Sequence, residues 1–273
     1  MRHEAATQQI SEADAKHAAR IWFPPPCGLR RRLLQALDAM SNAAVLDAEL
    51  QRLAMCRCEK IELAGLFARN PTAHKWKAFN RTIVLRELIY WRFHDLLVQV
   101  QLLASQKHAL GARILLRSAL ETVAMLVFIN FKMQQVLDGK VGFQEFGDST
   151  SKLLLGSRDE STSLEAINIL TVLKKCGSKH PGLVQLHELL CEAAHPNFDG
   201  LLGGYGETDH KNHVTHFVNS WKERWGVDQY QAVVQCISTF EHEYNDVWPP
   251  LYESLERWVE HNDADFEAQQ NGI

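Results

Sequence analysis

Apolar residues recur every three or four positions along most of this chain, which is the period of an amphipathic α-helix. The pattern predicts helical stretches over 29–69, about 79–104, about 107–137 and about 228–261. The first of these divides into two helices near Ser41-Asn42. Because no segment shows the alternation of a parallel sheet, the sequence predicts an all-α fold, a bundle of seven to nine helices.

Turn residues mark where several helices begin and end. Gly139 suits the C-terminal cap of the 107–137 stretch, and a short helix is predicted over 143–155. Pro181 suits the first position of a helix that ends at Ala194. These positions predict short connections between neighbouring helices.

The second half of the chain carries weaker signals. Hydroxyl side chains at 161–163 predict the N-cap of a helix over 164–176. Residues 200–218 are rich in Gly and His and predict a small irregular or hairpin insertion. Pro249-Pro250 is expected to interrupt the last helical region.

The two ends of the chain are more polar than its middle. Residues 1–27 are interpreted as a polar N-terminal arm that ends in a run of three prolines. Residues 28–262 are predicted to form a single helical domain, and residues 263–273 a C-terminal tail.

The composition fits a folded globular protein. The chain has 273 residues, of which 46% are hydrophobic and 23% charged, and this balance excludes disordered and collagen-like proteins. A net charge of −4 gives no general positive field that would attract nucleic acid or an anionic membrane. The longest apolar run, 114–131, is interrupted by Arg117 and Glu121, so no membrane span is expected. Six cysteines and no secretory signal indicate a reduced, cytoplasmic protein.

Three charged residues form a stripe on the most apolar predicted helix. Arg113, Arg117 and Glu121 are four residues apart, so they share one face. Apolar residues surround that face, and a helix that is apolar all round is buried. Arg117 and Glu121 are therefore expected to be desolvated and to need partners. They are either an ion pair that fixes helix register or part of a functional site.

His195 and Asn197 follow a later helix and are candidate partners for this stripe. Pro196 favours an extended conformation for His195 and can redirect its imidazole ring, while Asn197 suits a turn closed by Gly200. A histidine so placed can act as an acid, a base or a ligand. The alternative is a capping and turn motif with a structural histidine. The candidate catalytic residues are therefore Arg117, Glu121, His195 and Asn197.

These motifs resemble a group of uncharacterised bacterial helical proteins that often neighbour mobile-element genes. The resemblance depends on three short segments, Leu115–Thr122 with its R-S-x-L-E motif, Glu192–Asn197 with the start of H-P-N-x-x-G, and the Gly-rich Gly200–Tyr205. It covers roughly residues 80–260. It implies a helical fold without implying an activity.

A weaker resemblance is to the HEPN ribonucleases, through Arg69, Asn70 and His74. Metal-independent RNA cleavage needs a histidine to move the 2′-hydroxyl proton and an arginine to stabilise the phosphorane charge. In that family the motif lies on a helix and is completed across a dimer. Pro71 departs from this pattern, because proline ends or starts a helix. Arg117 with His195 is an alternative pair.

We therefore expect an interaction or regulatory protein acting in a stress or mobile-element context, with a homodimer or another protein as its partner. The alternative is a HEPN-like ribonuclease, and only this alternative has RNA as a partner. No cofactor and no metal are expected, because the triplet His210, His213 and His216 cannot converge on one face of a helix or a strand. No membrane partner is expected.

Overall fold

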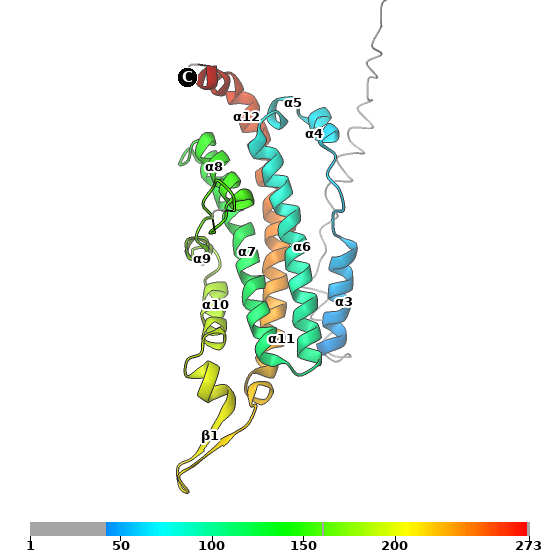
Figure 1. The fold of residues 1–273 in the computed structure, drawn as a ribbon. Helices are drawn as coiled ribbons and strands as arrows, with labels where there is room; N and C mark the ends of the chain where they lie inside the picture. The colour runs from blue at the N-terminus through cyan, green and yellow to red at the C-terminus, as the bar shows by residue number, and fades with distance from the viewer. Residues whose placement is uncertain (1–41, 160, 272–273) are drawn as a thin grey trace, which may run out of the picture.

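The computed structural model describes residues 42–159 and 161–271, so the predicted arm at 1–27 lies outside the described residues. Helices run lengthwise beside one another in an elongated bundle with a small hairpin at one end (Figure 1), which confirms the predicted all-α fold. In chain order the elements are α3 (Asn42–Met55), α4 (Leu63–Arg69), α5 (Pro71–His74), α6 (Lys77–Ser105), α7 (Ala109–Leu137), α8 (Phe143–Leu155), α9 (Ile169–Gly177), α10 (Pro181–Ala194), the π-helical η1 (Asp199–Gly203), β1 (Gly206–Asp209), β2 (Val214–Phe217), α11 (Trp221–Glu241), the π-helical η2 (His242–Val247) and α12 (Trp248–Asn271).

Helix α7 is the centre of the bundle. It packs against α6 along its length and also contacts α8, α9, α10, α11 and α12. Val127, Phe128 and Ile129 are consecutive and therefore point about 100° apart around the helix, and all three are buried. The prediction that this helix is covered on nearly all sides is therefore confirmed. By length and composition it could cross a membrane, but 61% of its most apolar window is buried inside the protein, as in the core helix of a soluble protein.

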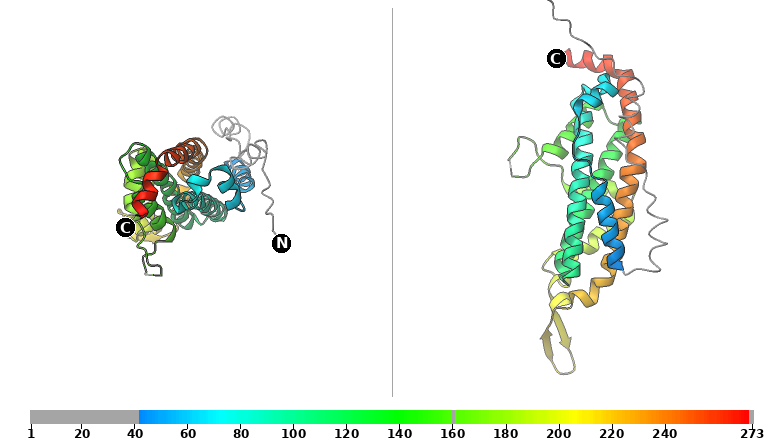
Figure 2. Two further views of the ribbon diagram at one scale, coloured as in Figure 1. Left: turned by 90° about the horizontal axis from the view of Figure 1, so that it is seen from above. Right: turned by 90° about the vertical axis from the view of Figure 1, so that its right-hand side faces the viewer.

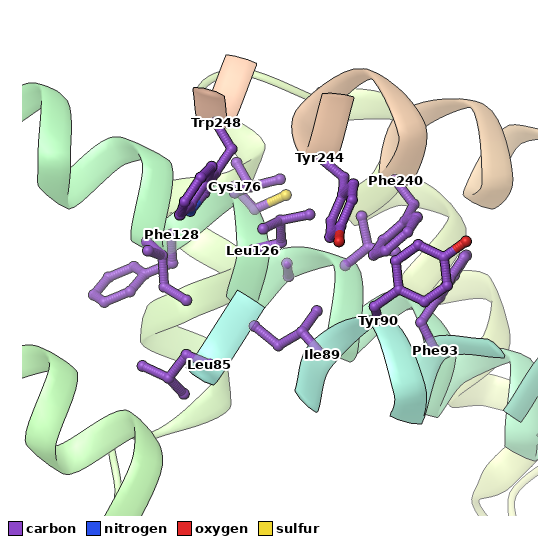
Figure 3. Packing of buried hydrophobic residues seen from close by; sticks show 14 of the residues in the cluster. Leu85, Ile89, Tyr90, Phe93, Leu126, Phe128, Cys176, Phe240, Tyr244 and Trp248 are labelled. Carbon is purple, nitrogen blue, oxygen red and sulfur yellow. The ribbon is translucent and has the colours of Figure 1, made fainter. Parts of the chain in front are cut away.

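An aromatic cluster joins α6 to the C-terminal helices (Figure 3). The rings of Phe93 and Phe240 are stacked with their centroids 4.2 Å apart, and those of Tyr90 and Tyr244 meet edge to face at 5.0 Å. The Tyr90 hydroxyl donates a hydrogen bond to the Leu53 carbonyl at 2.9 Å and so attaches α3 to the same core. Such rings contribute both buried area and defined geometry.

The predicted break near Ser41-Asn42 lies at the edge of the described residues, and helix α3 begins at Asn42. A further break, which was not predicted, lies at 56–62. This segment is held on α6 by Trp91, whose Nε1 donates to the Cys58 carbonyl at 2.8 Å and whose ring carries the Arg57 guanidinium at 4.1 Å. Contacts with α6 therefore set the break.

The bounds predicted for α8 and α10 are confirmed, but those of α9 are wrong. Helix α9 begins at Ile169, because the Asn168 side chain accepts a hydrogen bond from the Leu170 backbone N–H at 2.9 Å. The hydroxyl side chains at 161–163 lie in a preceding irregular segment, where Thr162 bonds to Ser157.

Neither the predicted interruption at Pro249-Pro250 nor the predicted tail from 263 is observed. The chain stays helical from Trp221 to Asn271 through α11, η2 and α12 (Figure 2). The two prolines occupy the second and third positions of α12, where a missing backbone N–H is tolerated. The wider turn of η2 precedes them.

The C-terminal part of α12 is fixed by contacts with α8 and the start of α6. Trp76 Nε1 donates to Asp263 at 2.8 Å, and the Phe266 ring stacks on Phe143 at 5.1 Å. These partners come from distant parts of the sequence, which is why residues 263–271 form helix where local polarity predicts a tail.

A two-stranded hairpin occupies the predicted insertion at 200–218. Strands β1 and β2 are antiparallel, with Gly206 opposite Phe217. Its base is anchored by the buried Trp221, and Gly204 lies so close that a Cβ atom there would come within 2.3 Å of the indole nitrogen. A side chain at position 204 would therefore displace the hairpin from the bundle.

The central position of α7 makes Leu120→Asp a strong test of the fold. Leu120 is 1% exposed, so the new carboxylate would lie in the core at a cost of several kcal/mol against a total stability of about 5–15 kcal/mol. We expect loss of the cooperative thermal transition measured by circular dichroism. The matched change Leu170→Asp, at a position 66% exposed, should leave the transition intact. A cooperative transition in Leu120→Asp would contradict this architecture.

Candidate functional site

The predicted charge stripe on α7 meets α10 in a polar seam. Arg117 Nε lies 3.2 Å from Glu121 Oε1, and the same carboxylate oxygen lies 3.1 Å from Nε2 of His187 on α10. Cys191 Sγ lies against the His187 ring, 3.5 Å from Nδ1 and 3.8 Å from Nε2. These four residues form the seam cluster.

The seam cluster is half-buried, whereas Arg117 and Glu121 are predicted to be desolvated. Their side chains are 29% and 24% exposed. The hydrogen bond from His187 lowers the pKa of the Glu121 carboxyl, burial opposes this, and Arg117 adds to the lowering. Glu121 is therefore ionised at neutral pH, and its hydrogen bond with His187 links α10 to α7.

Arg113, the third member of the stripe, is buried and turns toward the backbone of α10. Its Nη2 donates to the Leu189 carbonyl at 3.5 Å. Arg113 therefore contacts the helix that carries His187.

His195 and Asn197 do not join the seam cluster. His195 is the C-cap of α10 with the extended backbone (φ −94°, ψ 145°) that Pro196 favours, and its side chain is exposed. Asn197 accepts a hydrogen bond from the Gly200 N–H at 3.0 Å, which confirms the predicted turn, and donates to Glu192. Within the described residues, no hydrogen bond or ion pair joins His195 or Asn197 to Arg117 or Glu121.

His187 is the partner that sequence reasoning missed. It lies four residues after Leu183 and three before Leu190, on the buried stripe of α10. A polar residue on an otherwise apolar stripe was the available signal, since a buried imidazole needs a hydrogen-bond partner.

The residues of the HEPN-like motif do converge, on a carboxylate of α12. Arg69 donates from Nη2 to Glu256, and His74 donates from Nε2 to the other oxygen of Glu256 at 2.9 Å. The Asn70 side chain accepts from the Ala73 N–H at 2.9 Å, which caps the short helix α5 begun by Pro71. Arg69, His74 and Glu256 are called the His74 triad here, and they join α4 and α5 to α12 at the end of the bundle opposite the hairpin (Figure 1).

Burial separates His74 and Glu256 from solvent, whereas Arg69 is partly exposed. The His74 side chain is 0% exposed and contacts the rings of Phe79 and Tyr252. Its geometry is that of a structural ion network which joins α4 and α5 to α12. RNA bound at the surface does not reach His74 in this conformation.

A second buried carboxylate, Glu243, organises the π-helical turn. It accepts hydrogen bonds from Lys179 Nζ at 2.8 Å, His180 Nε2 at 2.7 Å and Asn130 Nδ2 at 2.8 Å. Burial alone would raise the pKa of the Glu243 carboxyl, but these donors outweigh it and lower the pKa to about 2. Glu243 thus links η2 to α7 and to the connection between α9 and α10.

Across residues 42–159 and 161–271, no group of three His, Cys, Asp or Glu side chains is arranged to hold a metal ion. His210 and His213 lie in the turn of the hairpin and His216 lies on β2. In the seam cluster, Cys191 Sγ lies against the His187 ring, 3.5 Å from Nδ1 and 3.8 Å from Nε2, while Glu121 bonds to Nε2.

Comparison of the chain with protein-family models, with curated proteins and with solved structures finds no match. The argument for function therefore starts from the seam cluster, the His74 triad and the exposed surface.

The His74 triad predicts a large effect of Glu256→Gln. Loss of this charge leaves Arg69 and the buried His74 without their carboxylate partner. Breaking a buried pair in this way typically lowers the free energy of unfolding by about 3–5 kcal/mol. Urea denaturation should show this loss in the free energy of unfolding. Glu253→Gln removes an exposed carboxylate from the same helix and should change stability by at most about 0.5 kcal/mol. Equal effects of the two changes would show that the triad does not hold the end of the bundle.

The lowered pKa of Glu243 predicts a pH-dependent contribution to stability. The contribution is present above pH 4.5, the ordinary value, and is lost as pH falls toward the folded-state value of about 2. Glu243→Gln should therefore be less stable than the wild type by about 2 kcal/mol at pH 7, and this gap should close between pH 4.5 and 2. Urea titrations across that range measure it. The exposed Glu260→Gln is the control, and a gap independent of pH would contradict the assignment.

Proposed function

We propose that this chain is an interaction protein that binds through an apolar surface at the hairpin end of the bundle. Seven large apolar side chains within residues 198–218 are exposed, and together they are called the end surface here. They are Phe198, Leu201, Leu202, Tyr205, Val214, Phe217 and Val218. Exposed apolar clusters of this kind are typical of protein-binding sites.

The hairpin itself is the observation that carries the proposal. It projects from the bundle in all side views (Figures 1 and 2), and every residue of β2 is exposed. Phe217 is 88% exposed. A two-stranded hairpin without a covered face is marginally stable in water, so it is expected to gain a third strand or a packed face from another chain.

The chemistry of the two strand edges favours a second copy of this chain as the partner. Strand β1 carries Glu207 and Asp209, which would repel the same residues of a second β1. Strand β2 reads Val214-Thr215-His216-Phe217, with three strand-forming residues and no Asp, Glu, Lys or Arg to protect its edge. Two β2 strands can pair antiparallel about a twofold axis and form a four-stranded sheet.

The ribonuclease alternative remains a prediction. The convergence of Arg69 and His74 supports it, but both are bound to Glu256 and His74 is fully buried. The end surface is accessible as it stands, and so it favours an interaction or regulatory role. A cytoplasmic location fits the same proposal, since the five cysteines at described positions are free thiols.

Light scattering coupled to size exclusion tests the proposal. The wild type should be a dimer at about 100 µM, a concentration at which even a weak specific dimer assembles. Phe217→Lys places a charge in the paired strands and should give a monomer with unchanged helicity. Leu170→Lys changes another exposed apolar residue, on α9, and should remain a dimer. A monomeric wild type, or a Phe217→Lys dimer, would overturn the proposal.

A further inference from the structure

A cavity of about 410 Å³ lies between α7, α9 and the start of α12. The apolar part of its lining comes from Val127 and Phe131 on α7, Val247 on η2, and Pro250 and Leu251 on α12. Its volume falls within the range of about 300–1,000 Å³ that is usual for small-molecule sites, which combine apolar walls with a few polar groups. The walls of this cavity therefore suit the hydrocarbon part of a small ligand.

Two exposed lysines also line the cavity, and they differ in how their ammonium groups are bound. Lys179 Nζ lies 2.8 Å from Glu243 Oε1, so its charge is balanced within the protein. Lys175 Nζ lies 5.6 Å from the centroid of the Phe131 ring, which itself lines the cavity. Within residues 42–159 and 161–271, no carboxylate forms an ion pair with Lys175. Lys175 is thus an unbalanced positive charge beside an apolar cavity.

Glu243 does not cancel the charge of Lys175. Its carboxylate is fully buried and accepts hydrogen bonds from Lys179, His180 and Asn130, so its own charge is already offset. The described residues that line the cavity include no Asp and no Glu. The cavity is therefore complementary to a ligand with a negative charge.

We propose that this cavity binds a small amphipathic carboxylate, with its hydrocarbon tail against the apolar walls and its carboxylate paired with Lys175. A monoanion fits better than a phosphate dianion, because only one ammonium group of the lining is left to be balanced. Burial of several methylene groups supplies most of the affinity, and the single exposed ion pair selects the charge. This binding goes beyond the interaction role proposed above, because no residue of the end surface lines the cavity.

Isothermal titration calorimetry of the full chain with octanoate tests the proposal. We expect one binding site per chain. The affinity should rise about two- to fourfold for each methylene added from butanoate through hexanoate to octanoate. Octanamide has the same tail without the charge and should bind about three- to fivefold more weakly than octanoate.

Two lysine variants locate the bound carboxylate. Lys175→Gln should weaken octanoate binding about three- to fivefold and leave octanamide binding unchanged, so that the two ligands bind alike. Lys174→Gln is the matched control, because Lys174 is an exposed neighbour on α9 that does not line the cavity. It should leave both affinities unchanged. Both lysines are exposed, so both variants should keep the thermal transition of the wild type.

Two changes at the partly buried Leu251 locate the tail. Leu251→Gln makes the wall polar and should weaken the binding of octanoate and octanamide by a similar factor. Leu251→Glu adds a negative charge to the same wall and should weaken octanoate binding more than octanamide binding. Circular dichroism checks that both variants are folded.

A wild type that does not bind octanoate, or that binds octanamide equally well, would overturn the proposal. So would an octanoate affinity that is unchanged in Lys175→Gln, or one that falls equally in Lys174→Gln. Phe217→Lys, which changes the end surface, should bind octanoate like the wild type, so this result is independent of the dimer test.

Discussion

Helix α7 is stable in water only when other helices cover it, because its apolar side chains point in every direction. The remaining elements are arranged to meet this requirement. Helix α6 covers one side, α8, α9 and α10 a second, and α11 with α12 a third. The elongated shape follows, since a 29-residue helix needs neighbours along its whole length.

The buried and half-buried polar groups form hydrogen bonds and ion pairs that link one helix of the bundle to another. Glu121 connects α7 to α10, Asn130 connects it to η2 through Glu243, and Glu256 connects α12 to α4 and α5. Each carboxylate has more than one donor, which offsets the cost of removing it from water. The three carboxylates differ in how far solvent reaches them. Glu256 and Glu243 are enclosed, whereas the seam cluster opens to solvent beside Cys191.

Sequence reasoning predicted the elements whose ends are set locally. Pro181 and Gly139 fix the start of α10 and the end of α7 through backbone geometry alone. Sequence reasoning failed where a contact with a distant part of the chain determines the structure. The last turns of α12 depend on Trp76, and the exact partner of Glu121 depends on how α10 is rotated against α7. His187 was overlooked because a histidine on an apolar stripe does not reveal which helix supplies its acceptor.

The π-helical turn η2 sets the rotation of everything that follows it. An α-helix turns by about 100° per residue, so a change of one residue in the length of η2 would rotate α12 by that angle about its axis. Tyr252, Leu255 and Glu256 would leave the core together, although none of them had changed. Chain length in this short segment is therefore under tighter constraint than residue identity, and natural insertions or deletions are expected to avoid it.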